Sequence, residues 1–183
     1  MGSVDDEFTA YAESASGRLL GTAFLLCGNW HTAEDLTQAT LAKVFAAWRR
    51  ISSRDAVQAY TRRTLLNTYF VDCRRKRRGE VLTPDPAVLT GPVVPPPAPE
   101  LRLELMAALA ELPPRARAVV VLRYWEDMSV DQVAALLGCS PGNVKSQSSR
   151  ALAKLRLLLG DTGTGTPPRM TEDRGDSREV RNG

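Results

Sequence analysis

Apolar residues recur at helical spacing along most of the chain, and no segment shows the alternating pattern of a strand. Before residue 80, two apolar series are separated by Gly28 and Asn29, and a third follows the loop "RRISSRD". Apolar side chains repeated every three or four residues predict amphipathic helices. We therefore expect three or four helices there and four more after residue 100. Thr32, followed by Asp35, is the expected N-cap of the second helix.

Prolines divide the chain into two modules. Seven of the twelve prolines fall between Thr83 and Pro99, a density that sustains neither a helix nor a central strand. This predicts an extended linker at 80–99 between an N-terminal helical bundle at 5–79 and a C-terminal module at 100–160. The polar residues 161–183 are predicted to be disordered. The expected fold is all-α with two small domains, each so near the lower size limit for a core that docking on a larger partner would stabilise it.

The segment "MSVDQVAALLGCSPGNVKSQSSR" predicts two helices joined by a tight turn. Ser129 and Gln132 have capping-box spacing, Gly138 suits a left-handed C-terminal cap, and Ser140 with Pro141 begins the next helix. The stripe of that helix expected to be buried comprises Val144, Ala151, Leu152, Leu155 and Leu159. Its other side carries Asn143, Lys145, Ser146, Gln147, Ser149, Arg150 and Lys154. This is a helix-turn-helix pattern, with side chains suited to a DNA major groove. An ordinary helical hairpin with a hydrophilic face is the alternative.

Charge is distributed unevenly although the net charge is only +3. Residues 41–80 hold eleven Lys and Arg against three acids, whereas residues 1–40 hold one basic residue and six acidic ones. Clustered cations indicate a polyanion partner, with a solvated face or a targeting patch as the alternatives. The third helix combines Arg62, Arg63, Asn67 and Tyr69 with the run "RRKRR", a mixture that suits single-stranded or melted DNA. Its aromatics Tyr60 and Phe70, like Trp48, are expected in the core.

The remaining composition argues against several classes of protein. Three dispersed cysteines and one histidine give no zinc pattern, so we expect no metal and no cofactor. Unpaired thiols and an N-terminus without a signal peptide suggest a cytoplasmic protein, and no apolar run is long enough for a membrane span. No activated nucleophile or pair of carboxylates is evident, so we expect no enzyme.

The helix "TAEDLTQATLAKVFAAW" is predicted to expose Asp35, Thr37 and Gln38 beside a strongly apolar side. An acidic and polar face is poorly placed for DNA and well placed for a protein partner. The alternative is the ordinary solvated side of an amphipathic helix.

Taken in order, "AEDLTQATLAKVFAAWRR", "LLNTYFVDCRRKRR" and "ELPPRARAVVVLRYWEDMSVDQVAALLGCSPGNVKSQSSRALAKLR" resemble the two-domain extracytoplasmic-function sigma factors of bacterial RNA polymerase, most of all the actinobacterial branch. The resemblance covers about residues 8–159. It implies that Asp35, Leu36 and Gln38 bind core RNA polymerase. It also implies that the loop "RRISSRD" opens the −10 element together with Arg62, Arg63, Asn67, Arg74 and Arg75, while Asp72 holds neighbouring arginines. The −35 element would be read by Lys145, Ser146, Ser149 and Arg150.

Two positions depart from the family pattern, in which an Arg often stands at Gln147 and an apolar residue at Ser148. Since Ser148 follows Val144 by four residues on the buried side, we expect weaker packing and altered −35 recognition. The family's commonest partner is an anti-sigma factor, although nothing in this sequence encodes one. A stand-alone helix-turn-helix regulator is the alternative function. A single core that permanently hid both cationic faces would contradict the sigma-factor interpretation.

Overall fold

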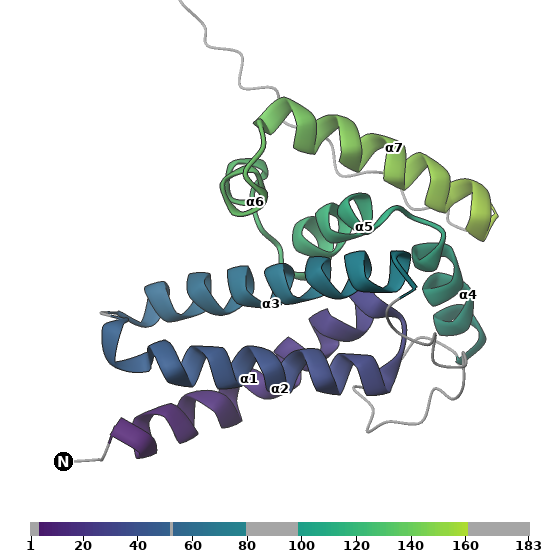
Figure 1. Cartoon of the computed structure of the whole chain (residues 1–183). Coiled ribbons are helices and arrows are strands. Elements are labelled where there is room, and N and C mark those ends of the chain that lie inside the picture. The colour runs from purple at the N-terminus through teal and green to yellow at the C-terminus, as the bar shows by residue number, and fades with distance from the viewer. Residues whose placement is uncertain (1–3, 52, 80–98, 161–183) are drawn as a thin grey trace, which may run out of the picture.

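The computed structural model describes residues 4–51, 53–79 and 99–160, and within these ranges it contains helices and no strand (Figure 1). The predicted all-α class is confirmed. Most of the predicted linker (80–98) and the predicted disordered tail (161–183) lie outside the described residues. Pro99, assigned to the linker from the sequence, is the first residue of a helix.

Three long helices form the N-terminal module: α1 (Val4–Cys27), α2 (Trp30–Ala47) and α3 (Arg54–Arg77), with the short 3-10 turn η1 (Trp48–Arg50) after α2. Figure 1 shows α2 and α3 lying side by side, with α1 packed against them. The N-cap of α2 is Asn29, whose side chain accepts a hydrogen bond from the Thr32 N–H at 2.9 Å. The prediction of Thr32 as the cap was therefore wrong. The positive φ of Gly28 turns the chain so that Asn29 comes first in the extended conformation that a cap requires.

The C-terminal module contains α4 (Pro99–Ala110), α5 (Pro114–Val120), the π-helical turn η2 (Val121–Trp125), α6 (Val130–Leu137) and α7 (Pro141–Leu159). The capping box of Ser129 with Gln132 is present, Gly138 is left-handed at φ 62°, and Ser140 caps α7. These three local predictions are confirmed. They place α7 beside α5 and α6, on the side of α5 away from α3 (Figure 1).

One apolar core runs through both modules. It includes Leu26 of α1, Leu65 of α3, Leu122 of η2 and Val144 of α7, each at most 1% exposed. The sequence predicted two modules that would each need a larger partner. In the structure they cover one another, which removes from water the apolar area that a small bundle leaves open.

The core of α3 differs in part from the prediction. Val57 and Leu65 are buried, and Phe70, expected in the core, is half-buried and packs against it. Tyr60, expected in the core, is 38% exposed, and Tyr69, expected beside DNA, is only 2% exposed. The ring of Tyr69 packs beside Phe70 with centroids 5.3 Å apart, so Tyr69 belongs to the core and its ring cannot stack on a base.

Candidate nucleic-acid interface

The outer face of α7 is polar and free of acidic side chains. Lys145, Ser149 and Arg150 are exposed, whereas Ser146 and Gln147 are half-buried. Bonds within the helix orient this face: Gln147 Nε2 donates to Asn143 Oδ1 at 2.6 Å, and Arg150 donates to the Ser146 hydroxyl. The four residues predicted to read DNA are thus together on one helix, and Ser146 reaches solvent only in part.

Ser148 lies on the opposite side of α7 and is 8% exposed, as predicted. Its hydroxyl lies 3.2 Å from the Tyr124 hydroxyl, and either group can donate. A buried hydroxyl without a partner would destabilise the helix packing, and this contact supplies the partner. Ser148 is therefore accommodated by Tyr124 of η2, a compensation that helical periodicity did not reveal.

A second polar face runs along α3. Arg63, Asn67 and Arg74 are all exposed and follow one another at spacings of four and seven residues, which places them on one side of a helix. Arg75 is also exposed but lies about 100° further round the helix. Asp72 pairs with Lys76 at 3.0 Å, not with a neighbouring arginine as expected, because i and i+4 share a face.

A groove of about 390 Å³ lies between α2 and α3 next to this face. Lys43, Arg50, Tyr60 and Asn67 line it, and Lys43 Nζ donates to the Thr68 hydroxyl at 2.9 Å. Cations, an amide and an exposed aromatic ring are the groups that receive unstacked bases. The sequence did not identify Tyr60 here, because an aromatic residue within an apolar series looks the same whether it packs inward or borders a groove.

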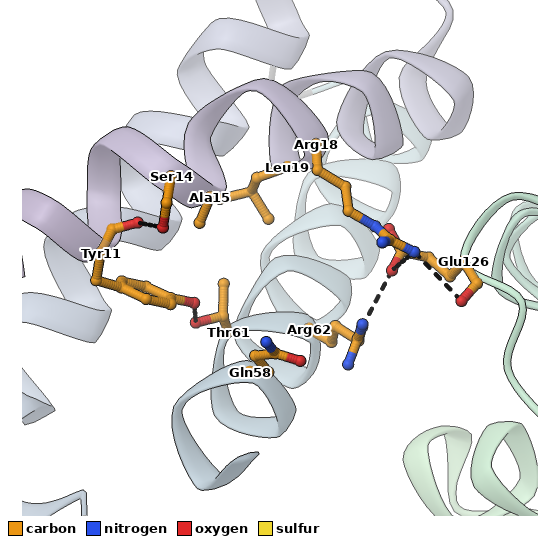
Figure 2. Close-up of a pocket in the computed structure, with 9 residues that line it drawn as sticks. All are labelled: Tyr11, Ser14, Ala15, Arg18, Leu19, Gln58, Thr61, Arg62 and Glu126. Carbon is orange, nitrogen blue, oxygen red and sulfur yellow. Dashed lines mark hydrogen bonds and ion pairs between the residues drawn. The ribbon is translucent and has the colours of Figure 1, made fainter. Parts of the chain in front are cut away.

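Arg62 departs from the other predicted −10 residues. Its side chain is 30% exposed and turns toward the C-terminal module, where Nε donates to Glu126 Oε2 at 3.1 Å. Figure 2 shows Arg62 and Arg18 converging on Glu126 at one end of a cleft of about 210 Å³. The structure therefore separates Arg62 from Arg63, Asn67 and Arg74, which remain open.

The polar face of α2 is smaller than predicted. Asp35 and Gln38 are exposed, but Leu36 is 4% exposed and packs in the core. Thr37, expected on the surface, is 5% exposed and donates to the Ala33 carbonyl at 2.8 Å. The assignment of the Leu36 side chain to a surface contact is thus corrected: it anchors the helix that presents Asp35 and Gln38.

Burial favours the neutral form of two of the three thiols. All three cysteines are free, and burial raises the pKa of Cys27 to about 11 and also raises the pKa of Cys73. Burial likewise raises the pKa of the neighbouring Tyr69 hydroxyl. Neutral thiols are poor nucleophiles and poor metal ligands. Within the ranges that the structure describes, no cluster of His, Cys, Asp or Glu could hold a metal ion, and no helix is long and apolar enough to cross a membrane.

Both modules match known protein families. Residues 12–79 match sigma-70 region 2, and residues 102–155 match sigma-70 region 4. The RNA polymerase sigma-E factor of Streptomyces coelicolor is 38% identical over 156 residues, which cover 84% of this chain and 86% of that protein. The sigma factor RpoE of Bartonella quintana, solved in complex with the anti-sigma factor NepR, matches with a TM-score of 0.69 at 25% identity. That match covers 84% of this chain and 96% of RpoE.

Fold, polar faces and matched regions together define a two-domain transcription initiation factor of the sigma-70 class. The chain belongs to the extracytoplasmic-function sigma factors of RNA polymerase, and the prediction from the sequence is confirmed. The alternative, a stand-alone regulator, predicted a ligand-binding or dimerisation domain in residues 1–80. Region 2 occupies most of that segment.

Proposed function

We propose that three separate surfaces divide the work of promoter recognition. Asp35 and Gln38 of α2 bind core RNA polymerase, the α3 face with its groove opens the −10 element, and the outer face of α7 reads the −35 element. The observation that carries this proposal is that all three surfaces are exposed while the shared core lies elsewhere. The polymerase supplies the chemistry, so the chain acts through binding alone.

At the −10 element the chain would favour single-stranded over paired DNA. Unstacking a base step costs a few kcal/mol, and stacking on an aromatic ring returns about 1–3 kcal/mol per base. The exposed ring of Tyr60 can stack in this way beside the Asn67 amide, and Lys43 and Arg50 can neutralise the nearby phosphates. Arg63 and Arg74 extend the cationic path along α3.

At the −35 element α7 would enter the major groove. Lys145, Ser149 and Arg150 present donors to base edges and phosphates, and no acidic residue between Gln132 and Gly160 opposes them. Arg150 is the strongest candidate for a specific contact, since a guanidinium can bond a base with two donors. An anti-sigma factor is a further candidate partner, because the related RpoE was solved bound to one.

The proposed polymerase contact is tested by a variant with Asp35→Ala and Gln38→Ala. Truncating two central interface residues should weaken association with core polymerase by about 1–3 kcal/mol, measured by pull-down and by titration of labelled protein. Glu13→Ala, which removes an exposed acid from α1, is the control and should bind as the parent does.

Two results would count against the proposal in different ways. Unchanged core binding by the double variant would show that α2 does not present the docking surface. If the parent chain neither bound core polymerase nor directed initiation from any promoter in a genomic library, the sigma-factor function itself would be wrong for this chain.

A further inference from the structure

Glu126 follows η2 directly, and it is a charged residue inside the contact between the two modules. Its side chain is 5% exposed. Oε1 accepts a hydrogen bond from the Thr22 hydroxyl at 2.5 Å, while Oε2 lies 3.1 Å from Arg62 Nε and 3.3 Å from Arg18 Nη2 (Figure 2). All three partners lie in the N-terminal module, 64 to 108 residues away in sequence.

Two further contacts join the same surfaces. Arg117 of α5 donates to the Leu26 carbonyl in the last turn of α1 at 2.8 Å, where a cation complements the helix dipole. The Trp125 ring lies over Gly21 so closely that a Cβ there would be 3.2 Å from Cζ2. The modules are thus held by apolar packing and by a small number of polar contacts, of which the Glu126 cluster is the most highly charged.

This arrangement is too small to contact both promoter elements. The −10 and −35 elements are about 25 base pairs apart, which is roughly 85 Å of duplex at about 3.4 Å per base pair. A compact body of about 140 residues has a radius of gyration near 14 Å and is roughly 40 Å across. The sequence places 19 residues (80–98) between the modules, and a chain of that length can reach about 65 Å. Separation is therefore needed, and the covalent connection permits it.

We propose that the structure is a closed, autoinhibited state in which Glu126 latches the two modules together and occupies Arg62. This inference rests on the proposed function of α3 and α7. Opening releases Arg62 for the −10 element and lets α7 reach the −35 element. When only a fraction of the chains is open, the apparent Kd for the promoter is the Kd of the open form divided by that fraction. The Glu126 contacts therefore set the protein concentration at which transcription begins.

The charge is what makes Glu126 suitable for this role. In the closed state its carboxylate is desolvated, and it is tolerated because Arg18, Arg62 and Thr22 all contact it. In the open state the carboxylate is hydrated. Removing the charge from Glu126 therefore disfavours the closed state, in which the two arginines lose their counterion, and has little effect on the fold of either module.

The test compares Glu126→Gln with Asp127→Asn in the full-length protein. Asp127 is exposed, and its φ of 53° suits Asn as well as Asp, so the control removes an equal charge one residue away. Small-angle X-ray scattering should give a larger radius of gyration for Glu126→Gln only. Hydrogen exchange should rise in the second half of α1, while circular dichroism stays unchanged.

Transcription with core polymerase gives the second readout. The concentration of Glu126→Gln that half-saturates promoter-directed transcription should fall by about tenfold, as it would if the open fraction rose from about one in a hundred to one in ten. Arg18→Gln removes an exposed partner outside the proposed DNA-binding set and should shift both readouts in the same direction. It replaces Glu126→Gln if that variant fails to fold.

The inference is overturned if the parent chain already scatters as an extended molecule, or if Glu126→Gln and Arg18→Gln stay as compact as the parent. It is also overturned if Glu126→Gln opens yet loses transcription, since Glu126 would then support promoter binding. Failure of the proposed function has a different signature: no variant transcribes, while the scattering and exchange results still report on the latch.

Discussion

Two side chains of α7, two positions apart in sequence, lie on opposite sides of the helix. Ser148 faces the core and bonds Tyr124, while Arg150, two residues later, points to solvent and bonds the Ser146 hydroxyl. The helix turns about 200° between them, so one residue fixes the packing and the other remains available to DNA. The departure of Ser148 from the family pattern consequently acts on packing and does not remove a donor from the reading face.

Arg150→Ala should weaken −35-dependent binding and transcription. Loss of a guanidinium contact to a base costs about 1–3 kcal/mol, and it should relax sequence preference at one position of the element. Competition binding of the holoenzyme to promoters with single-base changes measures both effects. Arg156→Ala removes an equal charge from the last turn of the same helix and should leave the preference unchanged. An equal loss of core association by Arg150→Ala would show that this residue is structural.

At the scale of elements, the turn between α6 and α7 sets the direction of α7, the helix proposed to read the −35 element. Gly138 ends α6 with φ 62° and ψ 46°, and its N–H bonds the Ala134 carbonyl. Ser140 then caps α7, accepting from the Asn143 N–H at 3.2 Å. Left-handed backbone is strained for residues with a Cβ, so glycine is required here for conformational reasons, not for space.

Gly138→Ala should therefore destabilise the protein by about 1–2 kcal/mol, although nothing lies within 4 Å of the added Cβ. Gly142→Ala is the matched control, since Gly142 has equally open surroundings but lies within the first turn of α7. It should be neutral or stabilising by up to about 1 kcal/mol because alanine favours helix. Urea unfolding of both variants measures the difference. Equal effects would mean that the φ of Gly138 carries no strain.

At the scale of the whole molecule, a continuous core joins modules that meet through few polar contacts. Leu26 of α1 and Leu122 of η2 belong to one apolar cluster, and Arg117 links the backbones of α1, α4 and the following turn through Leu26, Ala110 and Leu112. We expect such an arrangement to unfold as one cooperative unit, because the two modules share their core.

Calorimetry of the parent at low salt should show one unfolding transition. Arg117→Ala should lower stability by about 2–3 kcal/mol, the contribution of hydrogen bonds from a charged group, and should broaden or split the transition. Arg115→Ala is the control, because Arg115 bonds the Leu137 carbonyl within the C-terminal module. It should lower stability less and keep a single transition. Two resolved transitions in the parent would contradict a shared core.

The sequence by itself determined most of the helices, the caps at Ser129, Gly138 and Ser140, and the polar outer face of α7. These depend on contacts between residues a few positions apart, and local chemistry decides them. It predicted Thr32 as the cap of α2, whereas Asn29 is the cap. Both side chains can accept the bond, and only the backbone conformation selects one.

Only the tertiary structure decided that Leu36 and Tyr69 are buried, that Tyr60 borders a groove, and that Glu126 holds Arg62 and Arg18. An apolar or charged side chain carries no local signal of which distant surface will cover it. That outcome depends on how the two modules pack against each other to bury their apolar surfaces. In the sequence these modules are separated by a proline-rich segment.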